Sequence, residues 1–398
     1  MSSGLGKALE GVRVVDLSRL LPGPFATMLL GDMGAEVIKV EAPRGGDYAR
    51  YYQPFVGPMG AFFASINRNK RSVALDLKDP QALGALEALL SKADVLVESF
   101  RPGVLERLGL GPERLKRDFP SLVCCSISGF GQSGPMAKEA GHDITYLARA
   151  GVLATVGTKD GALVTPGFQL ADIAGGSLYA VSAILAALLA RHRTGQGAHL
   201  DISMTDGALS FLIPTLGVGA AGQPFAGPAQ GMLDGGVPCY GVYETSDGHH
   251  MALGALEPKF WVAFCQAVGW EHRASDGLTS GDKGRQIQQE LAELFASRTR
   301  QQWTELLDGV DCCCEPVRRP QETLDDPLFA HRDIFFTLET PGGSFLQTAT
   351  PLTPSDRSAF IPPPLLGEHT REVLTQAGIG QDVLDALLSR GAALDGQR

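Results

Sequence analysis

The sequence lacks an excess of positive charge. Its 398 residues include 34 lysines and arginines against 44 aspartates and glutamates, so the formal net charge is −10 at pH 7. Proteins that bind nucleic acid or anionic membranes through electrostatics usually carry a basic surface. The charge balance therefore argues against nucleic acid and a membrane surface as partners, but it still allows a small anion in a local basic pocket.

The sequence also lacks the cysteine spacing of a metal site. Its seven cysteines include the pair Cys124 and Cys125 and the run 312–314, and adjacent cysteines rarely suit a disulfide framework. Residues 1–7 contain no apolar leader segment. We therefore expect reduced thiols, no bound metal and a cytoplasmic protein, with 312–314 in an ordinary buried strand.

A clear membrane-spanning run is absent as well. One stretch, 173–190, is apolar, but it falls short of the ~20 residues that a span needs and contains Gly175, Gly176 and Tyr179. These features favour a helix buried in the core of a globular domain.

The first part of the chain alternates between short β-branched runs and helical spacing. We expect a helix over 25–33, after a break at 21–24, and another from Asp79; the expected strands are 12–17, 37–41, 72–77, 95–98 and 122–127. Such βαβ units require a parallel sheet covered by helices, which predicts a doubly wound α/β domain. The first turn has Pro-Gly-Pro in place of G-x-G-x-x-G, so we do not expect NAD or FAD.

A second domain is expected after a change in composition. Residues 217–231 are rich in glycine, alanine and proline, which is typical of a crossing between domains. Beyond it, 240–245 and 249–253 predict a hairpin. The stretch 326–343 is expected to be irregular.

Two titratable residues stand out in the first domain. His142 follows a glycine-rich loop, 128–135, and Asp172 opens the long apolar helix. Either group can carry a proton near neutral pH if its surroundings shift it, and Gly175 and Gly176 would let a substrate approach the backbone. A structural role stays open for both, because Asp172 could be a helix N-cap and His142 a structural histidine.

Other charged residues have similar ambiguity. Asp143 could orient the His142 ring or serve as a turn residue, and Glu257 could cap a helix or accept a hydrogen bond from that ring. The basic residues at 67–71, Arg101 and Arg107 form either a solvated surface or a phosphate anchor. No Ser-His-Asp spacing, zinc signature or P-loop is visible.

As a set, these motifs resemble a known family. The stretches 11–39, 71–78, 93–103 and 193–197 resemble the class III CoA-transferase superfamily, and the likeness extends from about residue 9 to 375. Within it, 141–146, 170–176 and 254–260 resemble the α-methylacyl-CoA racemase branch. Transferases of the superfamily usually carry an aromatic residue at the position of His142 and use the aspartate that matches Asp172 as a nucleophile.

The resemblance implies an interlocked homodimer with its active site between subunits. It implies a Rossmann-like large domain over 1–216, a small α+β domain with its linker over 217–335, and a return segment, 336–398, that completes the large domain. The implied CoA contacts are Leu75, Asp76, Leu77, Lys78, Ser99, Phe100, Arg101, Arg107, Gly141, Ile144, Thr145 and Tyr146. An arginine that contacts phosphate in some racemases is missing, and Lys39 or Arg44 are its candidate substitutes.

The resemblance also implies a reaction, the racemisation of 2-methyl-branched acyl-CoA thioesters through an enolate. Inversion needs a base on one face of the α-carbon and an acid on the other, and His142 and Asp172 are assigned these places, with Glu257 and Asp143 tuning His142. No metal, flavin or nicotinamide is needed, because no redox change occurs. The alternatives are CoA transfer with Asp172 as nucleophile and a protein that only binds CoA thioesters.

Overall fold

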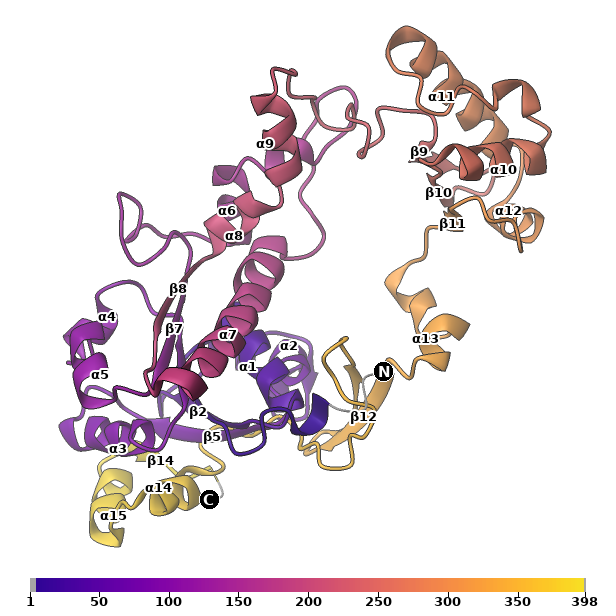
Figure 1. The fold of residues 1–398 in the computed structure, drawn as a ribbon. Helices are drawn as coiled ribbons and strands as arrows, with labels where there is room; N and C mark the ends of the chain where they lie inside the picture. Colours follow the sequence, from indigo (N-terminus) through magenta and orange to yellow (C-terminus); the bar gives the residue numbers. More distant parts are fainter. Residues whose placement is uncertain (1–4, 397–398) are drawn as a thin grey trace. The chain divides into compact units, whose positions relative to one another are not determined.

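The computed structural model describes residues 5–396, which form two compact units. Unit 1 contains the described chain up to Ala150, Gly167–Leu212 and the chain from Pro327 onward, and unit 2 contains Gly151–Pro166 and Ile213–Asp326. Figure 1 labels the elements of both units. The prediction of no apolar leader concerns residues 1–7. Residues 1–4 of this stretch lie outside the described residues.

A seven-stranded sheet in the order β14-β5-β2-β1-β6-β7-β8 organises unit 1. Its strands are β1 Arg13–Asp16, β2 Glu36–Glu41, β5 Lys70–Leu75, β6 Val95–Glu98, β7 Val123–Ser128, β8 His199–Ser203 and β14 Ala393–Leu394. All neighbours pair in parallel except β14, which runs antiparallel to β5. The strand order reverses between β1 and β6, as in doubly wound Rossmann folds, so the predicted α/β class is confirmed.

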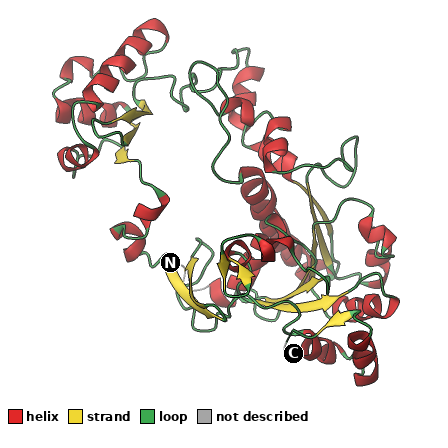
Figure 2. Ribbon diagram, turned by 180° about the vertical axis from the view of Figure 1, so that it is seen from behind, coloured by secondary structure: helices red, strands yellow, loops and turns green. Residues whose placement is uncertain are grey.

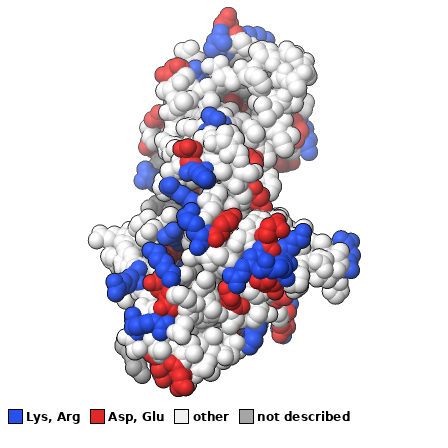
Figure 3. Space-filling view, turned by 90° about the vertical axis from the view of Figure 1, so that its left-hand side faces the viewer, with Lys and Arg blue, Asp and Glu red and all other residues white. Residues whose placement is uncertain are grey.

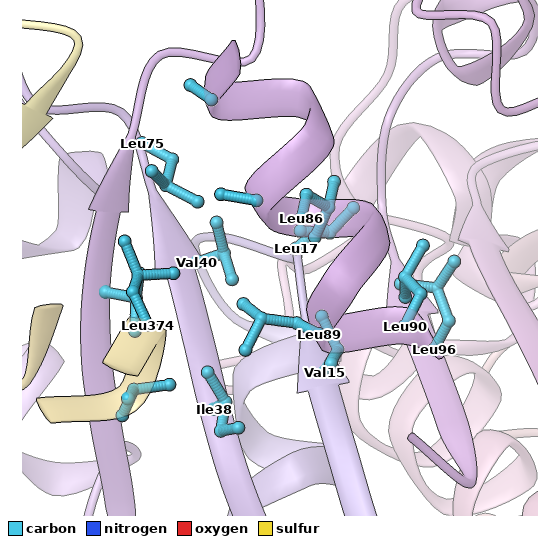
Figure 4. Close-up of a cluster of buried hydrophobic side chains, with 14 of the residues drawn as sticks. Val15, Leu17, Ile38, Val40, Leu75, Leu86, Leu89, Leu90, Leu96 and Leu374 are labelled. Carbon is cyan, nitrogen blue, oxygen red and sulfur yellow. The ribbon is translucent and has the colours of Figure 1, made fainter. Parts of the chain in front are cut away.

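Helices cover both faces of this sheet (Figure 2). The helices of unit 1 include α1 Pro22–Asp32, α3 Pro80–Leu90, α4 Val104–Arg107, α5 Pro112–Asp118, α7 Tyr179–Thr194, α14 Thr370–Ala377 and α15 Gln381–Ser389. On one face, Val15, Ile38 and Leu75 pack with Leu86 of α3 and Leu374 of α14 (Figure 4). Helices α1 and α7 contact the sheet and each other and form a second layer.

The first crossover differs from the sequence-based expectation of a break at 21–24. Pro22 is the first residue of α1, where the missing N–H leaves no additional unpaired group, so the helix begins before the expected range 25–33. Gly23 allows this turn to pack, since a Cβ atom at Gly23 would lie 2.1 Å from the Cβ of Ser18.

The apolar stretch of unit 1 begins as a π-helix, η4 Ala171–Leu178, and continues as α7. Among the described residues, Ala171–Thr194 is the one helix that is long and apolar enough to cross a membrane, and 39% of its most apolar window is buried within the chain. The π-helix packs against α1 and α8, Met204–Ser210, whereas Leu189 near the end of α7 is 64% exposed. The predicted core helix is therefore correct for the start of this stretch and wrong for its end.

Unit 2 contains a three-stranded antiparallel sheet, β11-β10-β9, packed on helices. Its main elements are β9 Tyr240–Glu244, β10 His250–Gly254, β11 Cys314–Pro316, α9 Ile213–Ala220, α10 Pro258–Val268, α11 Gly281–Phe295 and α12 Arg300–Leu306. The β9–β10 hairpin confirms the prediction for 240–253. Aromatic side chains contribute to the core of unit 2; for example, Tyr243 stacks on Phe295 with 5.0 Å between ring centroids.

The unit boundaries differ from the predicted domains 1–216, 217–335 and 336–398. Residues 151–166 belong to unit 2, where Lys159 Nζ donates to Gln288 Oε1 at 2.7 Å. The chain crosses into unit 2 after Leu212 and returns at Pro327. The stretch expected to be irregular contains α13 Pro327–His331 and most of a hairpin, β12 Phe335–Thr340 and β13 Gly343–Thr348. The crossing after Leu212 lies close to the expected crossing at 217–231, whereas the membership of 151–166 in unit 2 and the return at Pro327 depend on tertiary contacts.

The remaining elements are short. They are η1 Leu5–Lys7, η2 Tyr48–Tyr51, β3 Phe55–Val56, β4 Met59–Gly60, α2 Ala61–Ser65, α6 Asp143–Arg149, η3 Leu153–Thr155, η5 Glu271–Arg273 and η6 Pro320–Thr323.

Candidate active site

A cleft of about 230 Å³ opens in unit 1 beyond the carboxyl ends of β1, β2, β5 and β6; we call it the strand-end cleft. Leu17, Val40 and Leu75 give it a buried apolar wall, and Arg19, Asp76 and Lys78 are among its polar residues. Doubly wound sheets bind ligands at this edge, near the point where the strand order reverses. The position of the cleft therefore suits a nucleotide-containing ligand.

Most implied CoA contacts of the first domain lie at or next to this cleft. Leu75, Asp76, Leu77, Lys78 and Phe100 line it directly. Ser99 adjoins it, since Ser99 Oγ accepts a hydrogen bond from the main-chain N–H of Arg19 at 3.3 Å. Arg101 and Arg107 are exposed near it, before α4 and at its end. Figure 3 shows basic side chains gathered on the face that carries α4 and α5, although the chain as a whole is acidic.

The basic cluster 67–71 does not serve as a phosphate anchor. Arg68 Nη2 lies 2.7 Å from Asp32 Oδ2 and Lys70 Nζ lies 3.1 Å from Asp16 Oδ2, and all four side chains are buried. Burial opposes ionisation of Asp16, but Lys70 and Lys39 outweigh it and lower the pKa of Asp16 to about 2. Arg68 and Lys70 are engaged in internal ion pairs, so the interpretation of 67–71 as a phosphate anchor is wrong.

Neither candidate substitute for the missing arginine lines the strand-end cleft. Lys39 is fully buried, and its Nζ lies 3.0 Å from Asp47 Oδ2 and donates to the carbonyl oxygen of Ser18. Arg44 is exposed in the turn that follows β2, outside the cleft lining. The basic residues that line the cleft are Arg19 and Lys78.

Two glycine-rich segments enclose the ring of Tyr146 in α6. A Cβ atom at Gly129 or at Gly141 would lie 2.4 Å from Cε1 of Tyr146, and Phe130 packs edge-on with 5.3 Å between ring centroids. Glycine is needed at both positions because the ring occupies the space of a side chain. The sequence showed the glycine-rich loop, but only the structure shows that Gly129 supports Tyr146.

The Tyr146 hydroxyl also lies close enough to Arg101 and Asp172 for both charges to act on it. Burial raises the pKa of the Tyr146 hydroxyl to about 12; the negative charge of Asp172 adds to this shift, and the positive charge of Arg101 opposes it. The hydroxyl therefore lies within electrostatic reach of both residues and stays a proton donor at neutral pH.

The start of α6 is tied to the start of the π-helix. His142 precedes α6, and its main-chain N–H donates to Thr145 Oγ1 at 3.0 Å. Asp143 Oδ1 accepts the main-chain N–H of Asp172 at 3.0 Å. This bond brings the segment of His142 beside that of Asp172. The His142 residue is exposed, as are Ile144 and Thr145 on the same turn.

Asp172 lies inside the π-helix and is not its N-cap, which is Leu170. Burial, with the charge of Asp143 as second cause, raises the pKa of Asp172 to about 7. The carboxyl can therefore hold or release a proton near neutral pH. The adjacent glycines do not admit a substrate, because a Cβ atom at Gly175 would lie 2.9 Å from the carbonyl oxygen of Met204 in α8.

Glu257 belongs to unit 2, where it is the exposed N-cap residue of α10 and makes no side-chain capping bond. The neighbouring run 312–314 is not a uniform buried strand. Cys312 is buried, Cys313 is exposed with a φ of 50°, and Cys314 begins β11. Burial, followed by the charges of Asp311 and Glu257, raises the pKa of Cys313.

Sequence reasoning missed Glu98, the last residue of β6. Its buried carboxylate accepts the main-chain N–H of Phe100 at 2.7 Å and so holds the loop that carries Ser99 and Phe100. Burial raises the pKa of Glu98 to about 7. A signal was available, because an acidic residue ends an otherwise apolar strand.

Comparison with known proteins agrees with this architecture. The profile of CoA-transferase family III matches residues 9–370. The chain is 40% identical over 381 residues to the "Alpha-methylacyl-CoA racemase" of Mus musculus, covering 94% of each chain. It is 35% identical to the "Succinyl-CoA:glutarate CoA-transferase" of Mus musculus, covering 93% of this chain and 86% of that protein.

A solved structure of a CAIB/BAIF family protein from Brucella suis has a TM-score of 0.78 and 30% identity, and the match covers 93% of this chain and 99% of that one. The named relatives include a racemase and a CoA-transferase, so kinship by itself does not choose between the two reactions. The family match covers more than half of the chain and agrees with the resemblance found in the sequence. This protein is therefore an enzyme of CoA-transferase family III.

Proposed function

We propose that this enzyme racemises 2-methyl-branched acyl-CoA thioesters. The observation that carries the proposal is the hydrogen bond from the main-chain N–H of Asp172 to Asp143, which joins the segment of Asp172 to that of His142; burial raises the pKa of Asp172 to about 7. Inversion of an α-carbon needs two groups that exchange protons near neutral pH, and an imidazole and this carboxyl meet that need. The identity to a racemase over nearly the whole chain supports the same reaction.

In this proposal, the two groups act from opposite faces of the α-carbon. Neutral His142 removes the α-proton from one enantiomer of the substrate, which leaves an enolate. Protonated Asp172 then delivers a proton to the opposite face of the α-carbon. For the other enantiomer, ionised Asp172 is the base and the His142 imidazolium is the acid. A pKa near 7 keeps both forms of Asp172 populated, as this exchange of roles requires.

The enolate oxygen also needs hydrogen-bond donors. The N–H of Asp172 already donates to Asp143, so the backbone at that residue is not free for this role. Among the described residues, the N–H of Thr145 in the first turn of α6 donates to the carbonyl oxygen of His142, whereas those of Asp143 and Ile144 have no acceptor, so we propose that these two stabilise the enolate.

We also propose a homodimer in which Glu257 of one subunit supports His142 of the other. Many apolar side chains are exposed in the single chain, among them Leu178, Tyr179 and Leu189 near α7 and Leu209 and Phe211 near α8. Exposed apolar groups of this extent favour burial in an interface. Sedimentation velocity at micromolar concentration is expected to give a mass of about twice 42.1 kDa, and a monomer would contradict this part of the proposal.

The decisive experiment is exchange of the α-proton in heavy water with the separate R and S forms of 2-methylacyl-CoA. We expect the wild type to exchange and invert both. His142→Gln and Asp172→Asn should each abolish inversion. Each variant should still exchange the α-proton of one enantiomer, and the two variants should retain exchange with opposite enantiomers. The exposed residues His192 and Asp206 provide matched controls, because His192→Gln and Asp206→Asn should behave as wild type.

CoA transfer with Asp172 as nucleophile is the second candidate, favoured by the 35% identity to a named CoA-transferase. A nucleophilic carboxylate must be ionised, which a pKa near 7 makes less complete at neutral pH. Transfer of CoA to a free carboxylic acid without α-proton exchange, or capture of Asp172 by hydroxylamine, would replace the racemase proposal. If His142→Gln changes neither reaction, the histidine has no catalytic role.

A further inference from the structure

The side chain of Arg19, just after β1, lines the strand-end cleft between two aromatic rings. Its guanidinium carbon lies 5.1 Å from the ring centroid of Tyr48 and 5.9 Å from that of Phe100, and Nη1 donates to the Tyr48 hydroxyl at 3.3 Å. The rings and the phenol position the guanidinium without neutralising its charge.

Other arginines around the first strands are paired with carboxylates. Arg50 Nη2 lies 2.7 Å from Glu41 Oε2, Arg68 is paired with Asp32, and Arg13 Nε lies 2.7 Å from Glu36 Oε2. Within the part of the chain that the structure describes, no carboxylate oxygen lies within 4.0 Å of the Arg19 guanidinium nitrogens. Arg19 therefore presents a full charge and several unused N–H donors to the cleft.

The shape and chemistry of the cleft identify the class of anion. The buried wall of Leu17, Val40 and Leu75 suits a flat apolar group such as a nucleotide base, and a guanidinium beside that wall matches phosphate oxygens with two parallel hydrogen bonds. Lys39 cannot take this role, because it is buried and paired with Asp47.

We infer that Arg19 binds a phosphate group in the nucleotide part of the acyl-CoA substrate. The identity of the ligand rests on the proposed function, whereas the unpaired arginine and the cleft are features of this chain. Some racemases of the resembling branch have an arginine just after the second strand, where this chain has Ala42, Pro43 and Arg44, and in this inference Arg19 supplies that phosphate contact. Its backbone bond to Ser99 also links it to the loop that continues to Arg101.

The test is calorimetric titration of the full-length protein with CoA, with dephospho-CoA, which lacks the 3′-phosphate, and with pantetheine, which lacks every phosphate. We expect Arg19→Gln to raise the Kd of CoA by ~10- to 100-fold, the range of a charge-assisted hydrogen-bond pair. The Kd of Arg19→Lys for CoA should lie between the values of wild type and Arg19→Gln, since lysine keeps the charge but cannot form two parallel hydrogen bonds as a guanidinium does. Arg13→Gln is the matched control, because Arg13 is at the other end of β1 and paired with Glu36.

The three ligands separate the outcomes. An equal loss with CoA and dephospho-CoA supports a contact to the diphosphate, and a loss with CoA alone supports a contact to the 3′-phosphate. An unchanged Kd for CoA in Arg19→Gln, or an equal loss with pantetheine, overturns the inference. A thermal unfolding scan shows whether each variant is folded, and Arg19→Lys provides a second variant if Arg19→Gln is not.

The result is separable from the choice of reaction, because CoA binding does not depend on the fate of the acyl group. If Arg19→Gln weakens CoA binding while no α-proton exchange is found, the racemase proposal fails and the Arg19 contact stands. If wild type exchanges the α-proton but Arg19→Gln binds CoA normally, only the Arg19 contact fails.

Discussion

Two groups of ionisable residues in unit 1 differ in how their charge is used. In the first group, Asp32 with Arg68 and Asp16 with Lys70 form buried ion pairs at distances of 2.7 and 3.1 Å. At the candidate site, Asp172 has a raised pKa and Arg19 lacks a carboxylate partner among the described residues. Loss of one partner from a buried pair leaves an uncompensated charge and destabilises the fold, whereas a charge without a partner remains available to a ligand.

The comparison shows that residue type does not reveal the role of a charge. Both groups consist of aspartates and basic residues. They differ in the position of the nearest opposite charge. Four experiments sharpen or break this distinction.

The largest effect is expected for Asp172→Asn. Loss of one general acid–base group should lower the rate of racemisation by ~10²- to 10⁴-fold, because asparagine cannot carry the proton. Stability to urea should not fall, since a partly desolvated carboxyl without a cation is removed. Inversion rates by chiral chromatography and urea unfolding measure the two quantities. A variant that keeps its activity but unfolds easily would place Asp172 with the structural charges.

Asp32→Asn should have the opposite profile. Asp32 accepts hydrogen bonds from Arg68, Asn69 and Thr353, so its replacement leaves the buried Arg68 guanidinium without a charge partner. The expected loss is about 3–5 kcal/mol of unfolding free energy, measured in urea. CoA affinity of the folded fraction should be unchanged. The exposed Asp118→Asn is the control with little expected change, and a similar midpoint in both variants would contradict the assigned role of the buried pair.

The pH dependence of stability should have opposite signs in the two groups. The pKa of Asp172 rises from 3.8 to about 7, so the folded state holds more protons and stability falls as pH rises through that window. Glu98 acts in the same direction, and the slope per group reaches at most about 1.4 kcal/mol per pH unit. Asp16, with its pKa lowered to about 2, instead loses its contribution as pH falls from 3.8 towards 2.

Urea unfolding between pH 2 and pH 8 tests this difference. Asp172→Asn and Glu98→Gln should each flatten the decline between pH 4 and pH 7 without affecting the acid limb, and Asp206→Asn should leave the whole curve as in wild type. A decline of unchanged slope in Asp172→Asn would show that its pKa is close to the ordinary value.

The smallest effect is expected for Arg13→Gln. The ion pair of Arg13 with Glu36 is partly exposed, with side-chain exposures of 31% and 32%, so solvent screens it. Loss of the pair should cost at most about 1 kcal/mol of unfolding free energy, and CoA affinity should remain at the wild-type value. Urea midpoints and calorimetry measure both, and a weakened affinity would show that the charge of Arg13 reaches the cleft.

Much of the fold could be predicted because its signals are local. The β-branched runs with intervening helical spacing identified the parallel sheet and its class, and the turn at 246–248 identified the β9–β10 hairpin. The candidate residues His142, Asp143 and Asp172 were also recognised from local motifs, and a hydrogen bond now connects their segments.

The sequence by itself determined the alternation of strands and helices, because hydrophobic periodicity and turn residues act over a few positions of the chain. Tertiary structure alone decided which charges are paired: Lys70 meets Asp16 across 54 positions of sequence, and Arg19 is left between Tyr48 and Phe100. It also decided where unit 1 resumes at Pro327. Electrostatic pairing and burial depend on distances between remote residues, and those distances exist only once the chain has folded.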